Sequence, residues 1–287
     1  MSATPKVSVV TPSFNSSRTI RETIESVRAQ DYPHWEHLVM DGASSDATLD
    51  ILKEYPHLQW ISEKDEGHYH AMNKGILRGT GEIVAILNAD DCYLPGTLSA
   101  VGKAFAAHPD WDALFGDIIY IDGEGREIYR REEAVYDYDV LRFSGVCYVI
   151  HPTLFVRRSA HDRLGLYRHN EFKNACDLDF ILGLGRARCR VGHLPRCLVR
   201  YRWHNYGQSA DLRISRNMAR EAAVLCREHG RPEGWRGMCL QVCFRLKRQM
   251  QKFVVRRKVD LIPGTWKLRP HMKAKTEFSS NCGLDKL

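Results

Sequence analysis

The nonapeptide IVAILNADD at residues 83–91 decides the fold class of this 287-residue chain. Its first five residues are consecutively apolar and mostly branched, and acidic residues end it. A short apolar run of this kind is typical of a strand that is buried on both faces, as in a parallel sheet covered by helices. The abrupt polar break marks the carboxyl end of that strand. We therefore expect a central strand whose polar end lies at a ligand-binding edge.

The residues before this stretch alternate short apolar runs with helical periodicity, which is typical of an α/β fold. One helix is indicated by Ile20, Ile24 and Val27, which repeat at spacings of four and three. Similar short apolar runs lie before and after the strand that ends at Leu87, with helical segments between them. We therefore predict a mainly parallel central sheet flanked by helices. The other predicted strands fall at residues 7–10, 38–40, 58–61 and 113–115.

The rest of the chain is expected to complete this domain and to add helices. A helix is predicted from Asp177 to Arg186, and two more helices follow it. We predict an α/β domain over residues 1–210, a helical extension over residues 211–260, and a partly disordered tail over residues 261–287.

Polar residues follow four of the predicted strands. In an open parallel sheet the carboxyl ends of the strands meet at one edge, where ligands bind. Carboxylates that gather there repel one another unless a cation or hydrogen-bond donors compensate, and a diphosphate bridged by Mg²⁺ or Mn²⁺ would supply both. The polar segments are residues 11–15, Asp41, residues 63–67 and residues 88–91.

Other phosphate-binding motifs are missing from the sequence. It has no G-x-G-x-x-G after the first strand and no G-x-x-x-x-G-K-[ST] anywhere, which argues against a dinucleotide oxidoreductase and a P-loop NTPase. An isolated pair of adjacent aspartates would usually cap a helix or lie in a turn. Asp90 and Asp91 instead follow a predicted central strand and accompany the other polar segments, which favours a functional role for the pair.

Four motifs follow one another along the chain: SVVTPSFN at residues 8–15, DGASSD at 41–46, DEG with AMNKG between 65 and 75, and NADD at 88–91. In this order they resemble the motifs of the family-2 inverting glycosyltransferases with the GT-A fold, in particular the bacterial enzymes that build surface polysaccharides. The resemblance is close over residues 6–100, and four motifs in the right order are a specific signature. The last motif departs from the usual D-x-D pattern because Asn88 stands where an aspartate is frequent.

The resemblance implies a nucleotide-sugar pocket with a bound metal. Asp41 would accept a hydrogen bond from the base, Asp65 would help to hold the nucleotide, and Asp90 would bind Mg²⁺ or Mn²⁺. Asp91 would be a second metal ligand or a carboxylate that supports the first, and Asn88 would contact a ribose hydroxyl. The other residues expected in the pocket are Thr11, Pro12, Asn15, Asn73 and Ala89.

Two later motifs resemble the acceptor region of the same family. His151 opens HPTLF, which resembles an H-Q-x-x-F segment, with proline in place of glutamine. The segment ACDLDF at residues 175–180 resembles the E-D-x-D-L region, and by position Asp177 is the candidate general base, with Asp179 as the alternative. A carboxylate suits this role because the acceptor hydroxyl must lose its proton as it attacks. His204 is a candidate for contact with the metal or the phosphates.

The positive charge of the chain is concentrated in one segment. The formal net charge is +7, and residues 236–258 contain eight Lys or Arg and no acidic residue. Apolar residues repeat along one face of the helix predicted there, and basic residues occupy the other faces. This pattern resembles helices that lie on anionic lipid, so we predict contact with the inner surface of a membrane; a solvated charged face is the alternative.

The remaining features indicate a cytoplasmic protein. The nine cysteines form no C-x-x-C pair, the first residues lack an apolar region of signal-peptide length, and no apolar run approaches about 18 residues. We predict an enzyme that transfers a sugar, with inversion, from a nucleotide-diphosphate donor to a glycan or lipid-linked hydroxyl acceptor. The expected donor is a UDP-sugar, and no nucleic-acid partner is expected. The alternative is a non-catalytic nucleic-acid-binding or scaffold protein that uses the basic helix.

Overall fold

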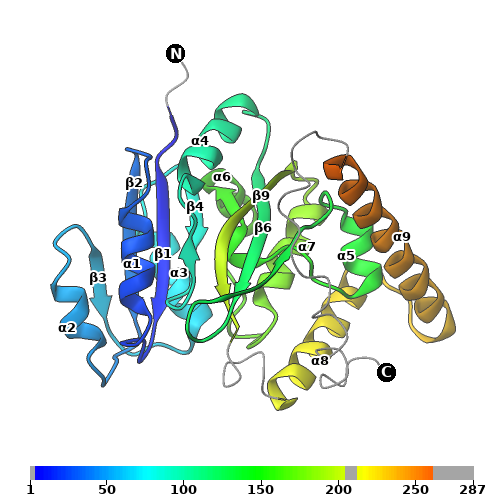
Figure 1. Cartoon of the computed structure of the whole chain (residues 1–287). Coiled ribbons are helices and arrows are strands. Elements are labelled where there is room, and N and C mark those ends of the chain that lie inside the picture. Colours follow the sequence, from blue (N-terminus) through cyan, green and yellow to red (C-terminus); the bar gives the residue numbers. More distant parts are fainter. Residues whose placement is uncertain (1–3, 204–211, 261–287) are drawn as a thin grey trace.

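The computed structural model describes residues 4–203 and 212–260, and in these residues one nine-stranded sheet carries helices on both faces (Figure 1). Along the hydrogen-bonded path the strand order is β3-β2-β1-β4-β8-β6-β9-β5, and β7 pairs with β6. Six strands are parallel to one another: β1 (Val7–Ser13), β2 (Trp35–Asp41), β3 (Gln59–Ser62), β4 (Ile83–Ile86), β6 (Ala113–Ile121) and β9 (Val191–Arg202). The antiparallel strands are β5 (Cys92–Tyr93), β7 (Glu127–Arg131) and β8 (Phe155–Arg157).

The alternation of side chains along β1 explains how the sheet is covered on both faces. Val9 packs in a cluster with α1 (Ile20–Arg28) and α4 (Thr97–Ala107), whereas Val10 packs on the opposite face with α3 (His68–Arg78). Both valines are fully buried. The prediction of a mainly parallel sheet between helices is therefore confirmed, and β4 lies in the interior of the strand order as expected.

A glycine allows α3 to lie close to the sheet. A Cβ atom at Gly75 would come within 2.2 Å of Cγ1 of Val10 and 3.2 Å of Cγ of Met40. Any side chain here would push α3 away from β1 and β2. This contact fixes the position of the helix that follows the DEG motif.

Residues 126–203 hold elements that the sequence pattern did not reveal. Strand β8 has only three residues, yet it lies between β4 and β6 in the middle of the sheet. A strand this short carries no measurable periodicity, so it was missed. The helices of this region are α5 (Tyr138–Ser144), η1 (His151–Thr153), α6 (Arg158–Leu164) and α7 (Cys176–Arg186), and α2 (Thr48–Lys53) lies earlier in the chain.

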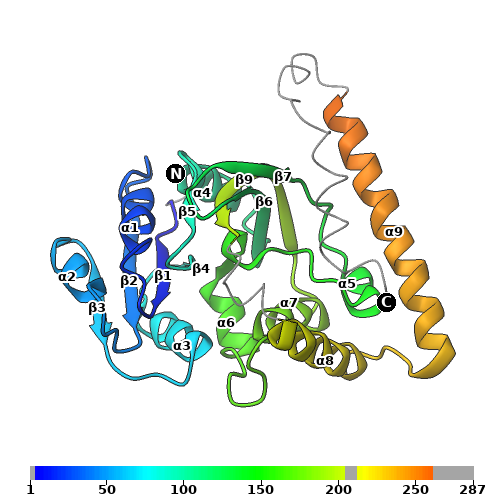
Figure 2. The same ribbon diagram turned by 60° about the horizontal axis from the view of Figure 1, so that its bottom comes forward.

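Two further helices follow the sheet, as predicted. In Figures 1 and 2, α8 (Leu212–Glu228) lies beside α7, and α9 (Gly234–Asp260) runs along the edge of the molecule next to α5. The expected boundary at residue 210 and the tail at 261–287 lie outside the described residues, so the domain division remains a proposal. Within residues 4–203 and 212–260, no helix combines the length and the apolar character that crossing a bilayer requires.

Candidate functional site

The carboxyl ends of the first four strands lie side by side at one edge of the sheet. In the parallel registers Ser13 is opposite Asp41, and Asp41 is opposite Ser62. The backbone N–H of Leu87, at the end of β4, donates to the carbonyl of Val10 in β1. Their distance of 3.0 Å is typical of a hydrogen bond between paired strands. The polar segments that follow these strands therefore start from neighbouring points.

Asp41 shapes the turn that follows β2. Its carboxylate is buried and accepts hydrogen bonds from the backbone N–H of Ser44 at 2.9 Å and from the hydroxyl of Ser62 at 2.7 Å. The Ser44 hydroxyl also donates to it. The turn contains Ala43 in a left-handed conformation with φ of 65°, which these bonds stabilise. The expected contact between Asp41 and a base remains a proposal.

Asn15 joins the first motif to this turn. Its backbone N–H donates to the Ser44 hydroxyl at 2.8 Å, and its side-chain oxygen accepts from the backbone N–H of Ser45 at 2.9 Å. Asn15 itself has a φ of 49°, a conformation that asparagine tolerates better than most residues. The loops after β1 and β2 are thus one hydrogen-bonded unit.

Asp65 lies directly over the same turn. A Cβ atom at Gly42 would come within 2.6 Å of Oδ2 of Asp65, so only glycine leaves room for this carboxylate. The other oxygen of Asp65 accepts from the backbone N–H of Gly67 at 2.8 Å. The structure therefore brings Asn15, Asp41 and Asp65 together, as the sequence predicted.

The NADD motif divides into an outer and an inner part. Asn88 and Asp90 are partly exposed, whereas Asp91 is buried. The Asn88 amide donates to Asp91 at 3.0 Å, and the backbone N–H of Arg202 donates to the other Asp91 oxygen at 3.0 Å. Burial and the nearby charge of Asp90 raise the pKa of Asp91 well above its usual range. This placement favours Asp91 as a carboxylate that supports Asn88 and Asp90 over a direct metal ligand.

Arg202 holds this motif in place and was missed by the sequence analysis. Its guanidinium donates to the carbonyl of Asp90 at 3.1 Å and pairs with Glu22 at 2.5 Å, although its side chain is only 2% exposed. Arg202 stands at the end of β9, and no motif marks it. The sequence offers one signal for this role of Arg202: it is an arginine at the end of an apolar run, in a chain whose predicted ligand-binding edge is acidic.

Four residues expected in the donor pocket have buried side chains, and their contact with a nucleotide remains a proposal. The Thr11 hydroxyl is hydrogen bonded to Nε2 of His37 at 2.9 Å, inside the sheet. The Asn73 amide donates to the carbonyl of Tyr167 at 2.8 Å and accepts from the N–H of the same residue at 2.9 Å. These hydrogen bonds hold the segments of Thr11 and Asn73 in place. The four residues are Thr11, Pro12, Asn73 and Ala89.

Asp177 lies in the first turn of α7 and meets a tyrosine from α3. The Tyr69 hydroxyl donates to Oδ1 of Asp177 at 3.1 Å. Burial and the charge of Asp177 raise the pKa of Tyr69 well above its usual range, so this hydroxyl remains a donor. Burial lowers the pKa of His68, while the charges of Asp177 and Asp65 oppose that shift. The helix α3 thus links the Asp65 loop to Asp177.

The alternative base, Asp179, is already engaged. Arg168 binds both of its carboxylate oxygens, at 2.8 Å and 2.6 Å. Ahead of Asp177, the carboxylate of Glu221 in α8 accepts from the backbone N–H groups of Asn174 and Ala175 at 2.9 Å and 3.0 Å. This arrangement supports Asp177 over Asp179 as the base, and it shows that α8 stabilises the loop before it.

The two histidines predicted for this region have different outcomes. His151 is 9% exposed, and its Nε2 is hydrogen bonded to the Tyr167 hydroxyl at 2.7 Å. Burial lowers the pKa of His151 to about 4, so its ring is neutral at pH 7. His204 lies outside the described residues, and its contact with metal or phosphate remains a prediction.

A group of histidines near Asp65 was also missed. Among the described residues, Glu66, His70 and His169 bring ligand-type atoms within 4.8 Å of one another. However, Nδ1 of His70 accepts from the N–H of Glu66 at 3.1 Å, and Nδ1 of His169 accepts from the Asn73 amide at 3.1 Å. Nδ1 of each ring is therefore already engaged within the protein, and Nδ1 of His169 also lies 3.4 Å from the carbonyl of Tyr167.

The residues at the sheet edge do fit a hard divalent cation. Mg²⁺ and Mn²⁺ prefer oxygen ligands, and Mg²⁺ is commonly held by one or two protein carboxylates together with substrate phosphates. Asp90 is a partly exposed carboxylate at that edge, and Asn88 beside it offers an amide oxygen. Such a site would be completed by the diphosphate of a ligand.

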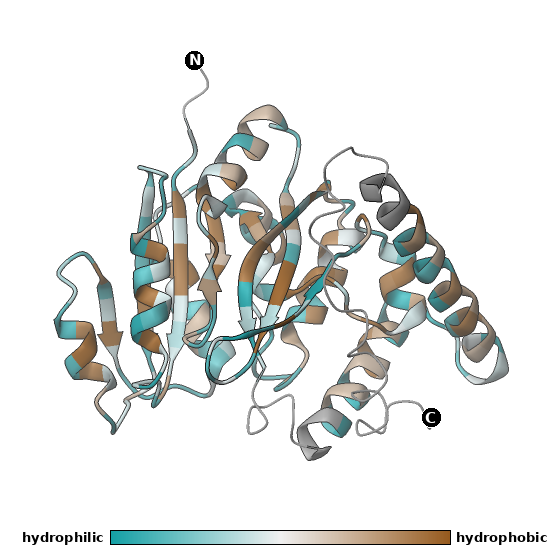
Figure 3. Cartoon of the chain, in the orientation of Figure 1, coloured by the Kyte–Doolittle hydropathy of each residue, from teal (hydrophilic) through white to brown (hydrophobic). Residues whose placement is uncertain are grey.

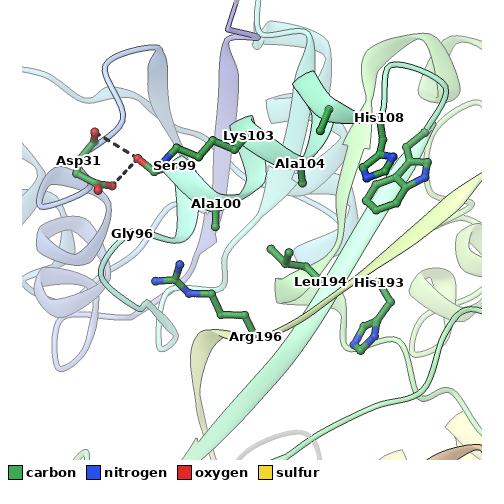
Figure 4. A pocket seen from close by; sticks show the side chains of 12 residues that line it. Asp31, Gly96, Ser99, Ala100, Lys103, Ala104, His108, His193, Leu194 and Arg196 are labelled. Atoms are coloured by element: carbon green, nitrogen blue, oxygen red, sulfur yellow. Dashed lines mark hydrogen bonds between the residues drawn. The ribbon is translucent and has the colours of Figure 1, made fainter. Parts of the chain in front are cut away.

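A groove elsewhere on the molecule contains none of the predicted site residues. It has a volume of about 640 Å³ and lies between α4 and β9, with Lys103, Arg196 and His193 among its lining residues (Figure 4). Asp31, which precedes β2, also lines it, so the groove lies towards the amino ends of the strands. Ligands of open parallel sheets bind at the opposite edge, and the site is therefore not in this groove.

The fold and the acidic carboxyl edge define a class, the open α/β sheets whose ligands bind at the carboxyl ends of the strands. Residues 8–165 match the model of glycosyl transferase family 2. The chain is 30% identical over 185 residues to a PGL/p-HBAD biosynthesis glycosyltransferase of Mycobacterium bovis, which covers 62% of this chain and 69% of that protein. The chain belongs to glycosyl transferase family 2.

A second relative matches over a shorter stretch. The teichuronic acid biosynthesis glycosyltransferase TuaG of Bacillus subtilis is 41% identical over 93 residues, which are 30% of this chain. This chain spans about a third of that relative, since the match covers 36% of it. The similarity is therefore strongest for one part of the fold.

Solved structures show that the fold is GT-A. TarS 1–349 of S. aureus in complex with UDP-GlcNAc has a TM-score of 0.61 at 20% identity, over 83% of this chain and 71% of that chain. A mannosyltransferase from Pyrobaculum calidifontis in complex with GDP-Man and Mn²⁺ has a TM-score of 0.55 at 17% identity, over 88% of this chain and 86% of that chain. The predicted family and fold are confirmed.

Proposed function

We propose that this chain is an inverting glycosyltransferase that moves a sugar from a nucleoside-diphosphate sugar to a hydroxyl acceptor. The observation that carries the proposal is the meeting of Asn15, Asp41 and Asp65 at one sheet edge, with α3 connecting them to Asp177. A UDP-sugar is the first donor to test because TarS is seen with UDP-GlcNAc, and a GDP-sugar is the second because the mannosyltransferase is seen with GDP-Man.

The donor would lie beside the turn of Asp41 and beside Asp65. In this proposal Asp90 and Asn88 hold Mg²⁺ or Mn²⁺ against the diphosphate, and Asp91 and Arg202 keep that motif in place. When bound, the cation neutralises the charge that grows on the departing diphosphate. The neutral Asn88 lowers the negative charge at this edge relative to a motif with three aspartates.

Asp177 would act as the general base. It removes the proton of the acceptor hydroxyl as that oxygen attacks the anomeric carbon from the side opposite the leaving diphosphate, which inverts the configuration. Tyr69 holds one oxygen of this carboxylate through its hydrogen bond and leaves the other for the acceptor. No covalent intermediate is needed in this sequence of events.

The acceptor class follows from the relatives. The names of similar proteins refer to teichuronic acid, O-antigen and PGL biosynthesis, which supports a glycan or lipid-linked acceptor in the synthesis of a surface polysaccharide or glycolipid. We propose a cytoplasmic enzyme that works at the inner face of the cell membrane.

Thermal unfolding with candidate donors tests the proposal. The full chain is mixed with UDP, UDP-sugars or GDP-sugars, each with and without Mn²⁺, and its Tm is measured. A ligand at 100 times its Kd stabilises the folded state by about 2.7 kcal/mol, which raises Tm by several degrees for a protein of this size. Stabilisation by one donor class that requires Mn²⁺ supports the proposal. Stabilisation by RNA or DNA alone, with a steep salt dependence, would contradict it.

A further inference from the structure

The outward face of α9 carries a line of exposed apolar side chains. Their spacing of three and four residues places them on one face of the helix. We call them the α9 stripe: Trp235, Met238, Val242, Leu246 and Met250, which are 59% to 69% exposed. Figure 3 shows hydrophobic residues along this helix at the edge of the molecule, away from the sheet. An exposed apolar line of this length is unusual for a protein surface that meets only water.

The inward face of α9 combines basic side chains with the apolar Phe244, which packs against the core and against Phe143. Glu133, whose side chain is 1% exposed, accepts from Arg248 at 3.0 Å and from Lys252 at 3.3 Å. Lys247 pairs with Asp137 at 2.7 Å. Arg248, Lys252 and Lys247 therefore bind acids of the protein, and the predicted contact of this helix with a membrane is left to its other residues.

These ion pairs fix the rotation of the helix about its axis. Burial would raise the pKa of Glu133, but the charges of Arg131, Lys252 and Arg248 outweigh it and lower the pKa, so the carboxylate is ionised. Turning α9 to bury the stripe would remove Arg248 and Lys252 from this buried charge, which is strongly unfavourable. These ion pairs therefore hold the α9 stripe on the outward side of the helix, where only a partner outside the body of the protein could cover it.

We propose that the α9 stripe is the surface by which this protein lies on an anionic lipid bilayer. Charge selects this occupant. Residues 236–258 carry eight basic side chains and no acid, whereas in the described part of the chain two acids, Glu133 and Asp137, pair with this segment. A second copy would bring two such helices together and repel, while anionic head groups complement the excess.

The contact is interfacial. The helix lies in the plane of the membrane with its apolar side chains inserted by about 5–10 Å, which is the usual depth for such helices. Over the 15 residue steps from Trp235 to Met250 the helix rises by about 22 Å, so the stripe forms an elongated contact. Binding of the α9 stripe to vesicles is independent of the proposed function. The further idea that this contact presents a lipid-linked acceptor to the enzyme rests on the proposed function.

Vesicle flotation with the full chain tests the inference. The probes are vesicles of phosphatidylcholine with about 30% phosphatidylglycerol and vesicles of phosphatidylcholine alone. The variant L246S/M250S should bind the anionic vesicles at least about tenfold more weakly, because two side chains no longer enter the apolar layer. The matched control is Leu77→Ser in α3, which changes a residue that is 69% exposed but lies off the stripe, and its vesicle binding should equal that of the unchanged protein.

Three results would overturn the inference. The first is an absence of binding to anionic vesicles, and the second is binding that salt abolishes but L246S/M250S leaves unchanged. The third is a dimer in light scattering that L246S/M250S dissociates, since the stripe would then join two copies. Donor-induced shifts in Tm, measured without lipid, report on the proposed function separately, so either idea can fail while the other stands.

Discussion

The substitution Tyr69→Phe tests whether a neighbouring hydroxyl controls the candidate base. Tyr69 is 7% exposed, and its hydroxyl donates to Oδ1 of Asp177 at 3.1 Å. A hydrogen bond to a charged group contributes about 1.5–3 kcal/mol, so its loss should lower kcat by roughly 10- to 100-fold. The donor KM should stay nearly the same, because the hydroxyl bonds Asp177 and none of the groups proposed to hold the nucleotide.

The assay is the release of nucleoside diphosphate from the donor that the Tm screen identifies, with the acceptor at saturation. Asp177→Asn alone should lower kcat by roughly 10²- to 10⁴-fold, the usual contribution of a general base. In that background Tyr69→Phe should have almost no further effect, because the two residues act as one unit. The matched control is Tyr136→Phe, which removes a partly buried hydroxyl that donates to the carbonyl of Ile181 in α7, the helix that carries Asp177.

The reasoning is refuted if the two substitutions are additive, with Tyr69→Phe costing as much in the Asp177→Asn background as in the unchanged protein. It is equally refuted if Tyr136→Phe lowers kcat as far as Tyr69→Phe does. In both cases the hydroxyl would act through general stability and would not position Asp177.

The other predictions concern the sheet and the donor turn. Burial would raise the pKa of Glu36, but hydrogen bonds from Lys6 and Ser8 lower it to about 2. Its charge therefore stabilises the fold by roughly 3 kcal/mol above pH 4.5, and this contribution is lost as the pH falls towards 2. Urea unfolding should show that difference between Glu36→Gln and the unchanged protein at pH 7, shrinking below pH 4.5; a gap that does not vary with pH would disprove the assignment. Gly42→Ala should displace Asp65 and weaken donor binding about tenfold with little change in Tm, whereas Gly123→Ala, where a Cβ meets nothing within 4 Å, should bind normally. Equal donor affinities for these two variants would remove Asp65 from the site.

The sequence predicted the fold where hydrophobic patterns are long or repeated. The run at 83–87 and the alternation before it located β1 to β4 and their helices, because two buried faces require continuous apolar strands. It could not locate β8, which has three residues and an antiparallel direction that only tertiary pairing sets. The inward basic face of α9 was equally hidden, because the acids that bind it lie more than 100 residues earlier.

The candidate site was predictable where residues follow a strand. Asp41 and Asp65 meet because parallel strands end at one edge, which periodicity alone implies. The internal hydrogen bonds of Thr11 and Asn73 were not predictable, because a motif gives the position of a side chain in the chain but not the direction in which it points. Tyr69 was missed because its partner, Asp177, is 108 residues away.

The most direct test of the account is the affinity of the nucleotide sugar for the full chain with and without Mn²⁺, measured for the unchanged protein and for Asp90→Ala. We expect Mn²⁺ to strengthen donor binding by at least about tenfold in the unchanged protein and in the control Asp50→Ala, an exposed residue of α2, and to have no effect in Asp90→Ala. If Asp90→Ala keeps the full Mn²⁺ dependence, the metal is held elsewhere and the proposed arrangement of the site is wrong.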